Sequence, residues 1–234
     1  MTCAHHPGAG NRHGHCLACL LEGALSASSV RDPAALVPAV KAEFDGASQL
    51  TIQVPLGASD TGSVFLVTSD GPVFRLLRLK TWRKPAPPDF LDRFRELRRR
   101  LEDWADESVP PPLAAIVDPG GCPSVLSEFR KGVPLPACVR SGGMDAKDAM
   151  AHLERLRQLT CRAHVRGLIH GSVVPGNIIG HAEESAVHLL DFGLRPLVMP
   201  SGCHAHAAAA DIDGFAAIAR ILAEPSGTPK PGRL

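Results

Sequence analysis

The chain has 234 residues, of which 44% are apolar and 21% are charged, enough to bury the core of one large or two small domains. Its 25 Lys and Arg residues nearly balance its 24 Asp and Glu residues, and the formal net charge is +1. This balance gives no general attraction to nucleic acid or to an anionic membrane. No apolar run approaches the roughly 20 residues that span a bilayer, and the N-terminus lacks the apolar stretch of a signal peptide. We therefore expect a cytoplasmic protein that binds neither nucleic acid nor a membrane.

Residues 1–25 gather potential zinc ligands. A C-x-x-H pair is followed by a C-x-x-C pair: Cys3, His6, Cys16 and Cys19. Zinc takes four such ligands in a tetrahedron, and two-residue spacing lets both side chains of a pair turn toward one ion. The pattern predicts a small structural zinc knuckle, in which His5 or His15 is an alternative to His6. An odd number of cysteines, seven, without a secretion signal argues against a disulfide scaffold.

A linker at 26–48 leads into a segment rich in strand signals. Three runs of Val, Leu and Phe are separated by turn signals, which predicts an antiparallel meander over 50–57, 63–69 and 72–80. A helix with Asp89 as its cap is predicted next, because apolar residues recur at helical spacing. These apolar residues are Phe90, Phe94, Leu97 and Leu101.

The remaining elements follow from the same patterns. Two more strands are expected at 113–118 and 124–129, a long amphipathic helix at 143–167, short strands at 177–180 and 186–191, a helix at 211–224, and a flexible tail at 225–234. The order, a β-rich part followed by a mainly helical one, predicts an α+β fold.

The stretch from 170 to 193 contains the most informative motif. His170, Gly171 and Ser172 are followed after four residues by Asn177, and then by Asp191, Phe192 and Gly193. This spacing resembles the H-R-D-x-x-x-x-N and D-F-G motifs of the protein-kinase-like superfamily. The resemblance covers roughly residues 50–224. It implies a two-lobed fold, with a β-rich N-lobe and hinge at 49–135 and a truncated, mainly helical C-lobe at 136–224.

The resemblance also implies a phosphate-binding side to the site. Three residues match the Gly-rich loop that covers the phosphates of ATP: Gly57, Gly62 and Val64. Ser59 stands where that loop usually has its middle Gly. Arg78, or alternatively Lys80, stands where a strand Lys contacts the phosphates, and Glu96 is the carboxylate that would pair with this cation.

Asp191 and Asn177 match the two residues that bind magnesium in this superfamily. The position of the catalytic base, however, holds Ser172 in place of Asp, and a hydroxyl that is not ionised near neutral pH is a poor proton acceptor. General-base catalysis contributes about 10²–10⁴-fold, so its loss leaves a slow enzyme or none. Gly171 replaces the Arg that would bind a phosphate on the activation loop. The following segment, 194–210, is short and has neither Thr nor Tyr.

These departures predict a pseudokinase with a regulatory or scaffolding role toward a partner protein. ATP and magnesium are its expected ligands, with a structural zinc ion at the N-terminus. The zinc motif resembles short motifs that precede bacterial Ser/Thr kinase domains, which favours a bacterial signalling setting. Alternatives are a weakly active Ser/Thr protein kinase, or a phosphotransferase similar to aminoglycoside and choline kinases, whose loop also has Gly after His. A third is a zinc-dependent interaction module with the kinase-like part as a platform.

Overall fold

The computed structural model describes residues 50–59, 61–70, 74–182, 186–199 and 204–224. The predicted zinc knuckle (Cys3, His6, Cys16 and Cys19), the linker and the C-terminal tail lie outside these residues. The chain divides into two compact units. The first takes its described residues from Met1–Ala86 and Pro112–Phe129, and the second from Pro87–Pro111 and Arg130–Leu234. The helix predicted after the meander therefore groups with the second unit.

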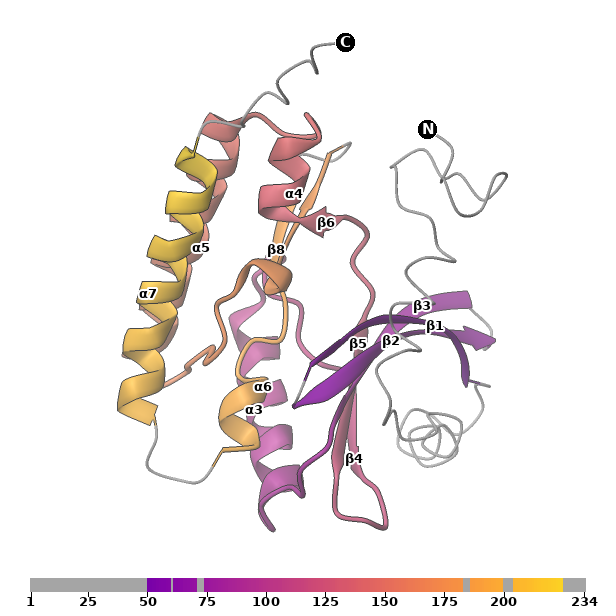
Figure 1. The fold of residues 1–234 in the computed structure, drawn as a ribbon. Helices are drawn as coiled ribbons and strands as arrows, with labels where there is room; N and C mark the ends of the chain where they lie inside the picture. The colour runs from indigo at the N-terminus through magenta and orange to yellow at the C-terminus, as the bar shows by residue number, and fades with distance from the viewer. Residues whose placement is uncertain (1–49, 60, 71–73, 183–185, 200–203, 225–234) are drawn as a thin grey trace, which may run out of the picture. The chain divides into compact units, whose positions relative to one another are not determined.

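The first unit is a five-stranded antiparallel sheet with the order β1-β2-β3-β5-β4 (Figure 1). Its strands are β1 Leu50–Ser59, β2 Gly62–Asp70, β3 Phe74–Trp82, β4 Ala114–Val117 and β5 Pro123–Glu128. The predicted meander and the two later strands are confirmed. Alternate residues of the strands, such as Phe65, Val67, Leu77 and Leu79, form one buried core, as the period of two in a strand requires.

The second unit begins with helix α3, Phe90–Trp104, whose four buried residues are the predicted Phe90, Phe94, Leu97 and Leu101. Asp89 occupies the predicted cap position before the helix. Its side chain makes no capping hydrogen bond, so the predicted side-chain cap is wrong. The helix ends where Ala105 takes a left-handed conformation with φ 47° and donates its N–H to Leu101 O.

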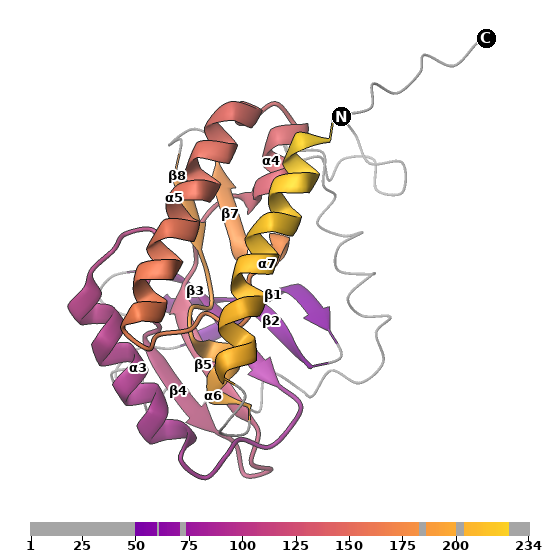
Figure 2. The ribbon, with the colours of Figure 1, turned by 90° about the vertical axis from the view of Figure 1, so that its left-hand side faces the viewer.

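The described residues of the second unit also form a three-stranded sheet with the order β6-β7-β8, four further α-helices and a short 3-10 helix at Pro175–Asn177. The strands are β6 Val133–Pro134, β7 Ile178–His181 and β8 Ala186–Leu189, and the helices are α4 Leu135–Arg140, α5 Ala146–Val165, α6 Leu194–Leu197 and α7 His204–Ala223. Helices α5 and α7 lie side by side (Figure 2). The predicted α+β class is confirmed.

Helix α7 begins at His204, well before the predicted start at Asp211, because the intervening residues are mostly Ala, the best helix former. Helix α5 begins at Ala146, three residues after the predicted start, because Asp145 caps it: the Asp145 side chain accepts the Lys147 N–H at 2.7 Å. None of the described helices is long and apolar enough to span a membrane.

Candidate functional site

The β7–β8 hairpin brings two predicted site residues together. Asn177 directly precedes β7, and Asp191 follows β8 by two residues. Because Ile178 pairs with Leu189 in this antiparallel hairpin, the two ends of the hairpin meet. The Leu190 N–H donates to Asn177 O at 2.8 Å and joins them. Residues 14 apart in the sequence therefore become neighbours at one end of a small sheet.

The side chain of Asn177 is buried and oriented by the loop before it. Its Nδ2 donates to Ser172 O at 2.8 Å. Its Oδ1 accepts no hydrogen bond from any described residue, so this oxygen remains available. Amide and carboxylate oxygens are the ligands that magnesium prefers, and the arrangement of Asn177 fits this ion.

Asp191 is 8% exposed and has a φ of 62°, one of two non-glycine residues with a positive φ in the described chain. Asp tolerates the left-handed region better than most residues, but the conformation still costs about 1 kcal/mol or more and needs support from its surroundings. The Asp191 carbonyl supplies part of that support by accepting the Leu194 N–H at 3.1 Å.

His170 is a structural residue in this loop. Its Nε2 lies 2.9 Å from Leu190 O, and its Nδ1 lies 3.0 Å from the Ser172 backbone N. A carbonyl oxygen can only accept and a backbone N–H can only donate, so Nε2 carries the proton and Nδ1 accepts. Both ring nitrogens are thus occupied, and the fully buried ring has no nitrogen left for proton transfer.

Asp211 of α7 fixes the same loop from the other side. Its carboxylate is fully buried and accepts three hydrogen bonds. Oδ1 accepts the Gly171 N–H at 2.8 Å, and Oδ2 accepts the His170 N–H at 3.0 Å. Oδ2 also lies 3.0 Å from Nε2 of His164, on α5. The start of the loop is therefore attached to both long helices.

Phe192 anchors the residues after Asp191 in the interior of the second unit. Its ring is edge-on to His170 at 5.2 Å and to Trp104 of α3 at 5.6 Å between centroids. The next residue, Gly193, has a φ of 75°, and a Cβ there would lie 2.5 Å from Leu97 Cδ1. Helix α3 therefore packs directly against the Asp191–Gly193 segment.

Ser172 occupies the loop position where the resemblance would place a base. Its backbone N–H and carbonyl are both hydrogen-bonded, to His170 Nδ1 and Asn177 Nδ2. Its hydroxyl has no hydrogen-bond partner among the described residues. The backbone geometry of the loop is thus complete, while the side chain offers no carboxylate to accept a proton.

The predicted phosphate-binding residues lie in the first unit, in the β1–β2 hairpin. Gly57 pairs with Val64, with a register shift between Pro55 and Gly57. A Cβ on Gly57 would meet nothing within 4 Å, so packing does not require glycine there. Gly62, in contrast, pairs with Trp82 of β3, and a Cβ there would collide with Thr81 O. Packing alone therefore requires glycine at position 62, whether or not a ligand binds.

The two candidate cations of β3 share one face of that strand but differ in environment. Arg78 is 9% exposed, between Leu66 of β2 and Ser127 of β5. Lys80 is half-buried, with Nζ 5.2 Å from the centroid of the Trp82 ring. Both positions stay open as the phosphate-binding cation.

Glu96 lies on the exposed face of α3, in the second unit. Its carboxylate accepts two hydrogen bonds from Arg99, at 2.8 and 3.0 Å, and these hydrogen bonds lower the pKa of the carboxyl. Glu96 is therefore engaged on its own helix. Its predicted pairing with a strand cation stays a prediction.

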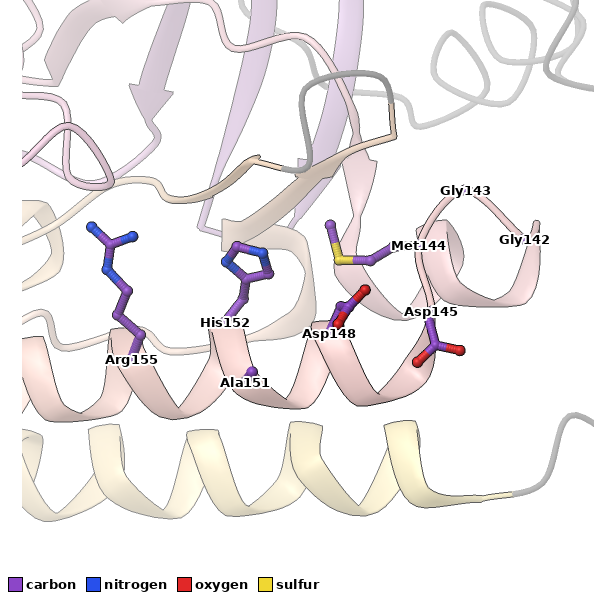
Figure 3. Close-up of a pocket in the computed structure, with 8 residues that line it drawn as sticks. All are labelled: Gly142, Gly143, Met144, Asp145, Asp148, Ala151, His152 and Arg155. Atoms are coloured by element: carbon purple, nitrogen blue, oxygen red, sulfur yellow. The ribbon is translucent and has the colours of Figure 1, made fainter.

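A cavity of about 500 Å³ opens elsewhere in the second unit, where the turn at 142–145 meets α5. Asp148, His152 and Arg155 point into it from one side of α5 (Figure 3). None of the predicted site residues lines this cavity. Within the part of the chain that the structure describes, no group of three or more His, Cys, Asp or Glu residues could hold a metal ion.

Sequence reasoning placed Asp211 only at the acidic start of the last helix, and it assigned no role to His164 or Arg93, although all three contact the loop or the segment after it. Asp211 and His164 show no local pattern, since they meet only through tertiary packing of α5 and α7. Arg93 had a signal: it falls among the apolar positions of α3, three residues after Phe90 and four before Leu97. A cation within a buried stripe needs a partner, and the partner is Pro196 O at 2.6 Å.

Comparison with known proteins adds no assignment: no protein-family model matches the chain, and no curated protein matches it at a significant level.

Proposed function

We propose that the chain is a protein-kinase-like pseudokinase, which binds magnesium and ATP without efficient phosphoryl transfer and acts on a partner protein. One observation carries the proposal. In the loop from His170 to Asn177, the Oδ1 atom of Asn177 is available to bind magnesium, while Ser172 stands at the position of the catalytic base.

The metal side has what nucleotide binding needs. Asn177 is oriented through Nδ2, which leaves Oδ1 for magnesium. Asp191 lies beside Asn177, at the same end of the β7–β8 hairpin, and has a φ of 62°. Magnesium held at these two residues would neutralise phosphate charge. Arg78 or Lys80 would add a cation, and Gly57 would allow the backbone to approach a phosphate closely.

The catalytic side lacks its proton acceptor. Ser172 provides a hydroxyl, and His170 has both ring nitrogens engaged. Loss of a general base slows transfer by about 10²–10⁴-fold. A protein that binds nucleotide but hydrolyses or transfers it slowly can hold one conformation for a partner to recognise. We therefore propose a regulatory or scaffolding role toward a partner protein.

The proposal is tested by measuring binding and transfer on the same sample. We expect saturable binding of a fluorescent ATP analogue in the presence of magnesium. We also expect no transfer of labelled γ-phosphate to the chain itself, to a general protein substrate, or to an aminoglycoside or choline, above a no-enzyme blank. Rapid transfer to any of these acceptors would replace the proposal with an active phosphotransferase. Absence of ATP binding would contradict the nucleotide-binding part of the proposal and favour an interaction module that uses the kinase-like part only as a platform.

A further inference from the structure

Arg93 differs from Arg95, on the same helix, in the partner of its side chain. It is 21% exposed, whereas Arg95 is 65% exposed and pairs with Asp92 on its own helix at 2.8 Å. Arg93 Nη2 donates to Pro196 O of α6 at 2.6 Å. Its Nη1 is buried, has no hydrogen-bond partner among the residues that the structure describes, and lies 3.8 Å from the Asp89 carboxylate. The Arg93 guanidinium therefore binds the backbone of α6, in the segment that follows Asp191.

Pro196 also packs against Gly171, in the loop from His170 to Asn177. A Cβ on Gly171 would lie 2.7 Å from Pro196 Cδ and 2.9 Å from Pro196 Cγ, and Gly171 has a φ of 79°. The proline ring thus occupies the space that any side chain at Gly171 would need. Leu194, Pro196 and Leu197 are all buried, although α6 has only four residues.

Such a short helix does not persist by its own hydrogen bonds, because helix nucleation is unfavourable. Its position must come from these contacts with α3 and with the loop. Asp191 is also in an unfavourable backbone conformation, which persists only where the surroundings impose it. Whatever holds α6 therefore also holds the residues between α6 and Asp191.

We propose that Arg93 is a positioning residue, which holds the segment from Asp191 to Leu197 in the conformation that presents the Asp191 carboxylate to magnesium. This role rests on the proposed function, since it concerns the same metal side. It also supplies a reason for Gly171: the segment is attached through its backbone to a cation on α3, so a loop arginine that binds a phosphorylated residue is unnecessary. The metal side is accordingly formed without phosphorylation.

The first test follows hydrogen exchange of backbone amides in the chain without nucleotide. The variant Arg93→Met keeps most of the aliphatic stem and removes the donor, and Arg95→Met is its matched control on the same helix. Loss of a hydrogen bond from a charged donor corresponds to about a 10- to 100-fold change in a local opening equilibrium. We expect exchange at Leu194, Val198 and Met199 to rise by this factor in Arg93→Met, while exchange in α5 is unchanged.

Unchanged exchange at these three amides in Arg93→Met would overturn the proposal, as would an equal rise throughout α5 and α7. The same rise in Arg95→Met would also overturn the proposal, because faster exchange would then follow from loss of any positive charge on α3. If Arg93→Met does not fold, Arg93→Lys gives the test, since a shorter ammonium can donate to Pro196 O but not fill the same volume. An intermediate rise in exchange is expected for Arg93→Lys, and wild-type exchange in that variant would contradict a specific need for the guanidinium.

The second test measures ATP affinity with and without magnesium in the same variants. We expect Arg93→Met to weaken magnesium-dependent ATP binding by about 10-fold or more and to leave magnesium-free binding unchanged, with partial rescue in Arg93→Lys. Equal weakening under both conditions would overturn the positioning role. If the unaltered chain binds no ATP at all, the proposed function fails, while the exchange result still decides whether Arg93 fixes the segment.

Discussion

The carboxylate of Asp211 holds the backbone of His170, with Oδ2 accepting the His170 N–H at 3.0 Å. The same carboxylate accepts the Gly171 N–H through Oδ1 and contacts His164 through Oδ2. A single buried group on α7 therefore sets the start of the loop that carries Ser172 and Asn177. The loop geometry depends on a residue more than thirty positions away in the sequence.

Asp211→Asn is expected to destabilise the protein by about 3 kcal/mol. The amide has one oxygen in place of two, so a buried N–H donor loses its acceptor, and the charge-assisted bonds weaken. Urea denaturation followed by circular dichroism measures the change in the free energy of unfolding. Asp213→Asn, at an exposed position of the same helix, is the control and is expected to change this value by less than about 0.5 kcal/mol. Equal effects of the two substitutions would contradict the anchoring role.

Ser172→Asp tests whether the missing base accounts for slow transfer. A carboxylate at this position can accept the proton of a substrate hydroxyl, so transfer of labelled γ-phosphate is expected to rise by about 10²–10⁴-fold over the unaltered chain. Ser172→Asn has a similar size without the charge and is expected to produce no rise. If Ser172→Asp gave no rise while ATP binding was retained, the loss of the base would not explain the inactivity.

The α+β class and most of the longer helices and strands were predictable, because these elements have strong local patterns. The alternation in β1–β3 and the spacing of Phe90, Phe94, Leu97 and Leu101 follow directly from which face is buried. The elements that sequence reasoning missed are short: β6, α4 and α6 have two, six and four residues and exist through tertiary contacts. The early start of α7 reflects alanine propensity, which an apolar-stripe pattern does not weigh.

The candidate site was predictable in part. The sequence predicted Asn177 and Asp191 on adjacent loops, and the structure places them before β7 and after β8 of one hairpin. Their role as magnesium ligands stays a prediction. The engagement of Glu96 with Arg99 was not foreseen, because an exposed helix face rich in both charges offers several i,i+3 and i,i+4 partners. Arg93 stands within the apolar stripe of α3, which marks it as a cation in need of a partner, but that partner is a backbone carbonyl and no pattern in the sequence identifies it.

Zinc at residues 1–25 stays a prediction with a direct check. Purified protein is expected to hold about one zinc ion per chain by elemental analysis, because four Cys and His ligands form a closed structural site. Cys16→Ser is expected to lower that content strongly, since it removes one of the ligands. Cys161→Ser, at an unbridged cysteine of α5, is the control and is expected to leave the zinc content unchanged. Zinc at background level in the unaltered chain would contradict the knuckle.

The carboxyl of Glu154 gives a prediction on pH. Hydrogen bonds from Arg157, and then from Gln158, lower the pKa of Glu154 to about 2. A pKa that is depressed in the folded state stabilises it above the unfolded value of about 4.3, and the stabilisation is lost as the pH falls toward 2. The stability difference between the unaltered chain and Glu154→Gln is therefore expected to be constant above pH 5 and to vanish near pH 2. Urea midpoints across this range measure it, and a difference that grew on acidification would contradict the sign.

The central claim is that Asp191 and Asn177 bind nucleotide through magnesium. A thermal-shift titration with ATP, with and without magnesium, tests it most directly, because a ligand that binds the folded state raises the melting temperature by mass action. The account predicts a stabilisation that needs magnesium, disappears in Asp191→Ala and persists in Asp213→Ala. No shift at saturating ATP, or a shift of equal size in Asp191→Ala, would contradict it.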